Sequence, residues 1–396
     1  MTNDRSKRLF WSLIGGSALA SVLISPFVLA GGTIQFGENS SVTIGAGLRT
    51  AYTSMEDSAG SGDDSSDFDL QSLRLYMSGQ LNELVKFTFN TECKGCVFGQ
   101  DAGDIGNGGE VDVLDAIVQF EFSPEFNVWA GRMLTPADRI ELNGPYYGLN
   151  WNQYTVPLLP SDQLGQAGLL GRDDGVTVWG NLGKFQYAVG AFDGVEGGPN
   201  QDDNVLLSAR FAYNFLNMES NPGYYTSSTY YGSLGDIFTL GLSMQSQSDG
   251  TGTATEAGDF DAIILDALFE KVLGNNDVLT IEGELKSMDA DLTAAALADP
   301  TCFCLFDGDS SFFTAAYLIN TTDSFGRWQP YLRYTNTEPD SGLDSDLTEI
   351  GLNYIIDSHN LRLNINWSSG DASLSGKRGP DTVSYTHLTL PTKRIV

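Results

Sequence analysis

The chain has 396 residues, and its 21 Lys and Arg against 51 Asp and Glu give a formal net charge of −30 at pH 7. So acidic a chain offers no basic surface to nucleic acid. Only 18% of the residues are charged and 45 are Gly, which argues against a soluble helical protein, while 41% apolar and 11% aromatic residues argue against disorder.

Residues 1–30 have the pattern of a secretory signal peptide. Basic residues precede the apolar run Leu9 to Leu29, which ends in small residues before Gly31. A membrane anchor is the alternative, because about 20 apolar residues can span a bilayer, but the glycines and Pro26 within the run favour cleavage. We therefore expect export, and no later segment is apolar and long enough for a helical span.

From residue 41 onward, apolar residues alternate with polar or small ones, as in strands with one apolar and one polar face. In the segment that starts at Val42, for example, Ile44 and Leu48 share one face and Thr43 and Arg49 share the other. The alternation predicts fifteen strands, over residues 41–53, 68–81, 84–92, 111–122, 126–134, 174–181, 184–192, 204–214, 234–246, 259–271, 276–288, 311–321, 327–336, 346–356 and 359–369.

Strand length and loop rhythm favour a transmembrane antiparallel β-barrel, all-β, over residues 31–381. The strands suit a tilted membrane strand of about 9 to 11 residues and exceed the length of about 5 to 6 that is common in a soluble sandwich, the alternative. Short connections alternate with long, acidic, Gly- and Ser-rich ones, as in outer-membrane barrels. The connection 215–233 breaks this rule, since it is long and Tyr-rich on the short side; it is either a misplaced boundary or a genuine elaboration.

The end of the chain lacks a convincing last strand. A closed bacterial barrel needs an even number of strands, so we expect sixteen in the native protein. Residues 382–396 do not alternate over a membrane length, contain Pro391, and resemble the translated read-through of a sequencing adaptor. We expect a non-native or irregular tail there, with the last strand missing or replaced; a real but irregular terminus is the alternative.

Several blocks of this pattern, taken in order, resemble the phosphate-selective porin O and P family of outer-membrane channels. The resemblance implies a sixteen-stranded porin, commonly trimeric, whose long third outer loop folds into the lumen as a constriction. The Lys that the family carries after a Gly-Gln-Phe motif is Leu134 here. The matching blocks are VLDAIVQFEFSPEFNVWAGRMLTP (113–136), RDDGVTVWGNLGKFQYAVGAFDG (172–194), LLSARFAYNF (206–215), WQPYLRYT (328–335) and LTEIGLNYII (347–356).

The polar faces of the strands predict a lumen of mixed charge, so the family's phosphate selectivity should not be carried over. Any single basic residue could instead form a structural salt bridge between neighbouring strands. The acidic residues expected to point inward are Asp115, Glu121, Asp266, Glu270, Glu282, Glu284 and Glu349. The basic residues expected to line the pore are Arg49, Arg74, Lys86, Arg132, Arg210, Lys286, Arg333 and Arg362.

The segment 135–171 is the expected constriction loop. It is rich in aromatic residues and Pro, and long apolar-rich loops are seldom left in water. We expect it to fold inward and to present charges to the basic residues of the wall, as porin constrictions do. An extracellular cap over the trimer or the barrel rim is the alternative. The charged residues of this loop are Asp138, Arg139, Glu141 and Asp162.

The four cysteines form two close pairs, Cys93 with Cys96 and Cys302 with Cys304. Val97 stands where a haem-attachment motif needs His. A zinc site is conceivable, but exported chains more often form disulfides, so we expect disulfides of undetermined pairing and neither metal nor cofactor.

The expected function is a passive diffusion channel for small hydrophilic solutes or ions, homotrimeric, in an outer membrane of lipids and lipopolysaccharide. The chain has only two His and no nucleotide-binding loop, so an enzyme is not expected. The alternative function is a non-conducting barrel that acts as an adhesin or surface scaffold.

Overall fold

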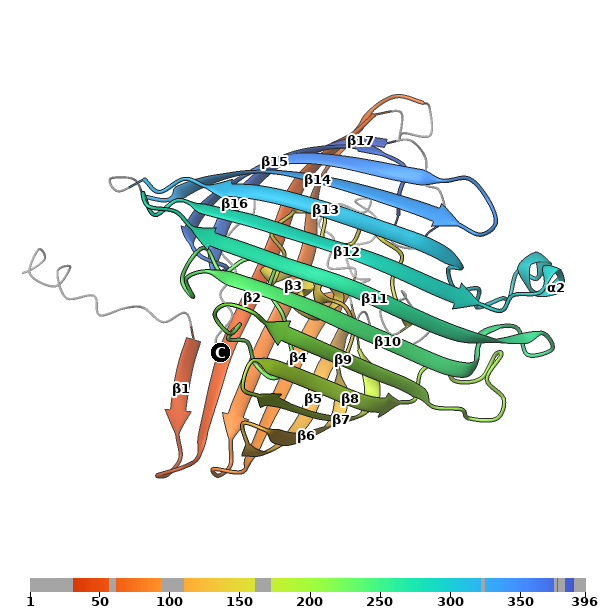
Figure 1. Cartoon of the computed structure of the whole chain (residues 1–396), viewed down its shortest axis with the longest axis horizontal. Helices are drawn as coiled ribbons and strands as arrows, with labels where there is room; N and C mark the ends of the chain where they lie inside the picture. Colours follow the sequence, from red (N-terminus) through yellow and green to blue (C-terminus); the bar gives the residue numbers. More distant parts are fainter. Residues whose placement is uncertain are drawn as a thin grey trace, which may run out of the picture.

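The structure is a computed structural model, and it describes residues 31–56, 62–94, 110–160, 172–321, 325–373, 376 and 382–387. The predicted signal peptide, Cys96 and Asp162 lie outside the described residues. Antiparallel strands wrap into a barrel (Figure 1). The strands are β1 (Gly31–Gln35), β2 (Ser41–Met55), β3 (Ser65–Gln80), β4 (Val85–Lys94), β5 (Glu110–Ser123), β6 (Phe126–Met133), β7 (Asp173–Leu182), β8 (Phe185–Phe192), β9 (Leu206–Asn214), β10 (Ile237–Gly252), β11 (Ala257–Val272), β12 (Val278–Ala290), β13 (Gly308–Leu318), β14 (Arg327–Pro339), β15 (Ser345–Asp357), β16 (Leu361–Gly370) and β17 (Thr382–His387).

The strands β2 to β17 form a closed ring of sixteen. Each pairs antiparallel with the next, and the ring closes where β17 pairs with both β16 and β2. The short β1 is an extra strand that pairs with the start of β2, with Gln35 opposite Ser41. The expected antiparallel barrel is therefore confirmed, and all fifteen predicted strands are present.

We expected the last strand to be missing or replaced. The structure has a strand at this position. Residues 382–387 form β17, whose His387 lies opposite Tyr52 of β2. This strand is only six residues long, far shorter than its neighbours. That the tail 382–396 is not native stays a prediction.

The two faces of the sheet differ as the alternation predicts. On β2, Ile44 is 48% exposed on the outer face, whereas the inward Arg49 is 8% exposed. On β12, Leu285 is 61% exposed and the next residue, Lys286, is 2% exposed. Apolar side chains thus cover the outer wall, and polar side chains are enclosed by the ring.

The two rims differ in their connections. One rim has short turns, such as 183–184 and 358–360, and the other has long connections, two of which contain the helices α1 (Arg139–Tyr147) and α2 (Ala294–Ala298). Neither helix is long and apolar enough to cross a membrane, and no other helix lies in the described ranges. The connection 215–236 is long although it lies on the short-turn rim. Because β9 and β10 lie where we expected them, it is a genuine elaboration.

Candidate functional site

The connection after β6 runs inside the barrel (yellow in Figure 1). We call residues 134–160 the inward loop. Its helix α1 begins at Arg139, and the side chain of the preceding Asp138 caps it by accepting a 2.9 Å hydrogen bond from the Glu141 amide. Gly144, with φ 63°, and the following Pro145 break the helical geometry, so the chain turns and continues across the barrel.

The first half of the inward loop docks on the wall formed by β9 to β12 through a buried lysine. Lys286 Nζ lies 2.7 Å from Asp138 Oδ2, 2.9 Å from Glu141 Oε1 and 3.6 Å from Glu284 Oε1. Each of these side chains is at most 1% exposed. One ammonium group therefore serves three carboxylates that have been removed from water.

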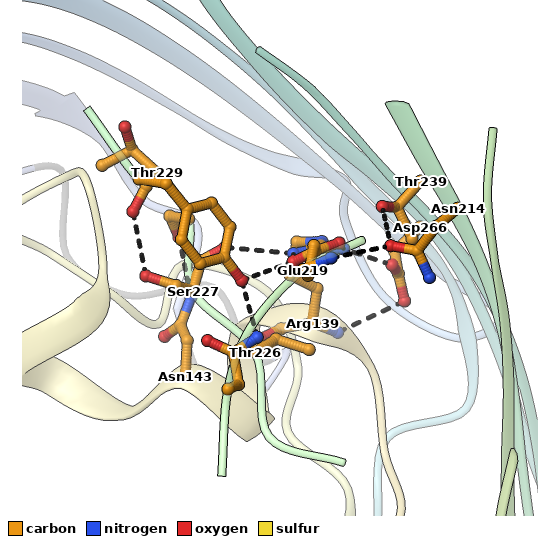
Figure 2. Close-up of polar contacts among 12 residues, drawn as sticks. Arg139, Asn143, Asn214, Glu219, Thr226, Ser227, Thr229, Thr239 and Asp266 are labelled. Carbon is orange, nitrogen blue, oxygen red and sulfur yellow. Dashed lines mark hydrogen bonds and ion pairs between the residues drawn. The ribbon is translucent and has the colours of Figure 1, made fainter. Parts of the chain in front are cut away.

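Two buried arginines hold the same region. Arg210 of β9 makes bonds of 2.5 and 2.9 Å to both oxygens of Asp266 on β11, and it also donates to the Ala137 carbonyl at 3.0 Å. Arg139 lies between Asp266 and Glu219 of the connection 215–236, as Figure 2 shows. Burial by itself would raise the pKa of Glu219, but the Arg139 guanidinium lowers it below its ordinary value.

This wall carries more carboxyl groups than cationic groups. Neither oxygen of Glu284 accepts a hydrogen bond from any described residue, although the whole residue is only 3% exposed. Glu282 lies two positions away on the same inward face of β12 and is 1% exposed. Carboxyl groups therefore outnumber ammonium and guanidinium groups on this part of the inner face.

The second half of the inward loop lies on a wall of arginines. Arg49 of β2 donates to the Trp151 carbonyl, and its guanidinium stacks 4.0 Å from the Trp151 ring centroid. Arg362 of β16 donates to the Gly148 carbonyl. Arg333 of β14 donates to the Asn152 and Gln153 carbonyls at 2.6 and 3.0 Å. These arginines therefore hold neutral backbone oxygens, not carboxylates.

The other expected inward bases form pairs with neighbouring strands. Arg74 pairs with Glu92, at a buried site, and Lys86 pairs with Glu121 at a partly exposed one. The expected inward acids Asp115, Asp266, Glu270, Glu282, Glu284 and Glu349 are all buried on the inner face. Sequence reasoning missed Glu92 and also Arg172, which binds Asp115 at 2.6 Å.

The prediction that Arg132 lines the pore is wrong. Along β6, Trp129 and Met133 are buried, whereas Arg132 faces outward. It binds Asp174 of β7 through two bonds of 2.8 and 2.7 Å, with side chains 32% and 47% exposed. The alternation of residues along β6 predicts that Arg132 lies on the outer face, and our expectation overlooked this alternation.

Cys302 and Cys304 form a disulfide in the connection after α2, and Cys93 is also disulfide-bonded. The zinc alternative is therefore wrong for these three residues. Within the described part of the chain, no group of three or more His, Cys, Asp or Glu is arranged to hold a metal ion.

Two small cavities beside the described part of the inward loop have volumes of about 30 Å³, next to Arg74 and Tyr146, and about 10 Å³, next to Arg139 and Glu219. Such volumes hold a water molecule or two. Passage of a larger solute past these residues therefore requires them to move.

Known proteins were compared with this barrel. A search of the curated proteins found no match. Among solved structures, the chain is similar in fold to an anion-selective porin from Comamonas acidovorans (18% identity, TM-score 0.55, covering 88% of this chain and 98% of that one). It is also similar to OmpT of Vibrio cholerae in its trimer form (13%, 0.51, 88% and 99%) and to OmpF of Salmonella typhi in complex with daunomycin (12%, 0.50, 90% and 99%).

These structures support the outer-membrane β-barrel fold. The family model of the phosphate-selective porin O and P matches residues 42–257, which is more than half of the chain. The fold and the family together make the protein an outer-membrane channel for small solutes. The chain belongs to the phosphate-selective porin O and P family.

Proposed function

We propose that this porin is a passive diffusion channel that prefers cations to phosphate and other anions, with the inward loop as its constriction. We further propose that residues 1–30 direct its export and that it assembles as a homotrimer, like the trimer form of OmpT that it resembles in fold. The family and the fold neighbours point to a channel rather than an enzyme.

The selectivity proposal rests on the contacts of the basic side chains in the lumen, which already bind other groups of the protein. Phosphate binding needs guanidinium or ammonium groups with N–H donors to spare. In the described residues, each base that we expected on the inner face, Arg132 excepted, already binds a carboxylate or a carbonyl, and so do Arg139 and Arg172. The pairs are Arg49 with Trp151, Arg74 with Glu92, Lys86 with Glu121, Arg139 with Glu219, Arg172 with Asp115, Arg210 with Asp266, Lys286 with Asp138, Arg333 with Asn152 and Arg362 with Gly148.

The wall of β9 to β12 has more carboxyl groups than cationic groups, whereas Arg49, Arg333 and Arg362 on the other wall bind only carbonyls. On β12, neither Glu282 nor Glu284 accepts a hydrogen bond from a described residue, and the whole chain carries a formal charge of −30. Charge of one sign around a low-dielectric passage concentrates counter-ions there. Small cations should therefore enter more readily than anions.

The reversal potential of the purified channel in a planar bilayer tests this proposal. In a KCl gradient, we expect a reversal potential with the sign that indicates preferential permeation of potassium. The sign should be the same when potassium phosphate replaces KCl. A potential on the anion side, or a larger anion contribution from phosphate than from chloride, would contradict the proposal.

A second candidate is a non-conducting barrel, which the small volumes of the two cavities beside Arg74 and Arg139 favour. The same bilayer experiment separates the two candidates. A scaffold whose interior never opens gives no conductance steps at any voltage, whereas a channel gives steps.

A further inference from the structure

The connection 215–236, which we call the inward connector, enters the barrel from the rim that otherwise has short turns. Its backbone starts and ends at the wall, where the Phe215 amide donates to the Phe238 carbonyl at 2.7 Å. Its middle is enclosed, since Tyr224, Ser228 and Thr229 are each 0% exposed. A surface turn would leave these residues in water, so the connector occupies part of the lumen.

The connector reaches across the mouth of the barrel. At one end, Tyr224 and Tyr225 pack on Trp129 of β6, with ring centroids 5.7 and 5.8 Å away. Gly223, with φ 57°, makes this possible, because a side chain there would overlap the Trp129 ring. At the other end, the Thr229 carbonyl lies 2.8 Å from Nε2 of His359, in the turn between β15 and β16. The segment is thus anchored on strands far apart around the ring.

A third anchor lies on β11. Glu270 accepts hydrogen bonds from the Thr229 hydroxyl at 2.7 Å, the Tyr230 amide at 3.0 Å and the Gly232 amide at 2.7 Å. The carboxylate is 0% exposed, and the connector satisfies it. Bonds between a charged acceptor and backbone amides are among the stronger hydrogen bonds in proteins.

The inward loop and the connector meet through polar contacts in the interior (Figure 2). The Thr226 hydroxyl donates to the Arg139 carbonyl at 2.6 Å, and Asn143 Nδ2 donates to Ser228 Oγ at 2.7 Å. The Ser228 amide donates to the Tyr147 carbonyl at 3.1 Å. Water can replace polar contacts of this kind, so the two segments can separate at a smaller cost than apolar surfaces of equal size.

The strongest of these contacts is a bidentate ion pair. Arg139 Nη1 and Nη2 bind Glu219 Oε2 and Oε1 at 2.8 and 2.6 Å, and the Tyr230 hydroxyl donates to the same carboxylate at 2.6 Å. Arg139 also lies 3.5 Å from Asp266 of the wall. One guanidinium therefore joins the inward loop, the connector and the barrel.

We propose that the inward connector is a second constriction element, latched to the inward loop by Arg139 and Glu219, and that release of this latch sets the size of solute that passes. Glu219 acts here as a positioning residue, because it holds Arg139 and need not touch the solute. The proposal rests on the proposed channel function.

The test uses two variants of the full-length channel in planar bilayers. Glu219→Gln keeps the shape of the side chain but removes the charge from the pair. Weakening a charge-assisted hydrogen bond shifts an equilibrium by about tenfold, so we expect about a tenfold higher ratio of open to closed time and entry of larger sugars in liposome swelling. The control is Glu125→Gln, an exposed acid on the same rim, which should behave as the wild type.

The second variant locks the latch. Asn143→Cys with Ser228→Cys places two thiols where the native side chains are in contact, and the oxidised protein should lose its conductance steps while a reductant restores them. Ser228→Cys alone, with and without reductant, controls for the native disulfides.

Each outcome decides between the two proposals. Steps in the wild type that neither variant alters would overturn the latch and leave the channel function standing. No steps in the wild type but steps in Glu219→Gln would support the latch and contradict a constitutively open channel. No steps in the wild type, in Glu219→Gln or in the reduced Cys pair would overturn both.

Discussion

The two halves of the inward loop meet opposite chemistry on the barrel wall. Residues 136–142 lie against β9 to β12, where Lys286 and carboxylates form a buried charge cluster. Residues 148–155 lie against β2, β14 and β16, where arginines donate to backbone carbonyls. The first half therefore depends on the balance of charge, and the second depends on the geometry of donors around neutral acceptors.

Removal of Lys286 should destabilise the first half of the inward loop, and this should be the largest of the predicted effects. Lys286→Met leaves Asp138, Glu141 and Glu284 buried without their cation, and breaking a buried ion pair in this way costs about 3 to 5 kcal/mol. We expect earlier urea unfolding and faster proteolysis within the inward loop. Lys86→Met is the matched control, because its pair with Glu121 is partly exposed and should contribute at most about 1 kcal/mol. Equal unfolding midpoints for the two variants would show that the cluster does not hold the loop.

Acidification should act next most strongly, through His359. Burial, with the nearby charge of Arg362, lowers the pKa of His359 from 6.5 to about 4. The unfolded chain binds this proton below pH 6.5 and the folded chain binds it only near pH 4, so stability is lost as pH falls through that window, by at most about 3 kcal/mol. Unfolding measured between pH 7 and pH 4 checks this, with His359→Gln as the control that should flatten the dependence. The same slope in the variant would assign the effect to carboxylates.

Strand alternation predicted much of this site, because a period of two is a local property of the sequence. It placed Arg49, Lys286 and Arg333 on the inner face before any contact was known. It could not supply their partners, since the Trp151 carbonyl that Arg49 binds lies about a hundred residues away along the chain. It also could not show that Glu219 reaches Arg139, because the connector carries no periodic pattern and is positioned by contacts from three parts of the ring.

Substitution of a basic residue in the arginine wall should lower the stability of the barrel less than substitution of Lys286. Arg333→Gln removes the donors to the Asn152 and Gln153 carbonyls, and the loss of hydrogen bonds from a charged donor costs about 2 kcal/mol. The freed carbonyls are neutral and can bind water, which recovers part of this cost, so the urea midpoint should fall by less than in Lys286→Met. Hydrogen exchange confined to residues 148–155 should nevertheless accelerate. Protection that stays unchanged there would mean that Arg49 and Arg362 suffice to hold this half.

Neutralising Glu284 should produce the smallest change, and one in selectivity rather than stability. Glu284→Gln removes one of the carboxylates for which no described residue donates a hydrogen bond, while the amide keeps its size. Because one carboxyl group among several on this wall is lost, the potassium-to-chloride permeability ratio should fall by about twofold, equivalent to about 0.4 kcal/mol. The matched control is Glu338→Gln, on the exposed outer face of β14, where the removed charge lies outside the lumen. If both variants shift the reversal potential equally, selectivity arises from the charge of the whole surface. A shift in Glu284→Gln alone assigns it to the acidic wall beside the inward loop.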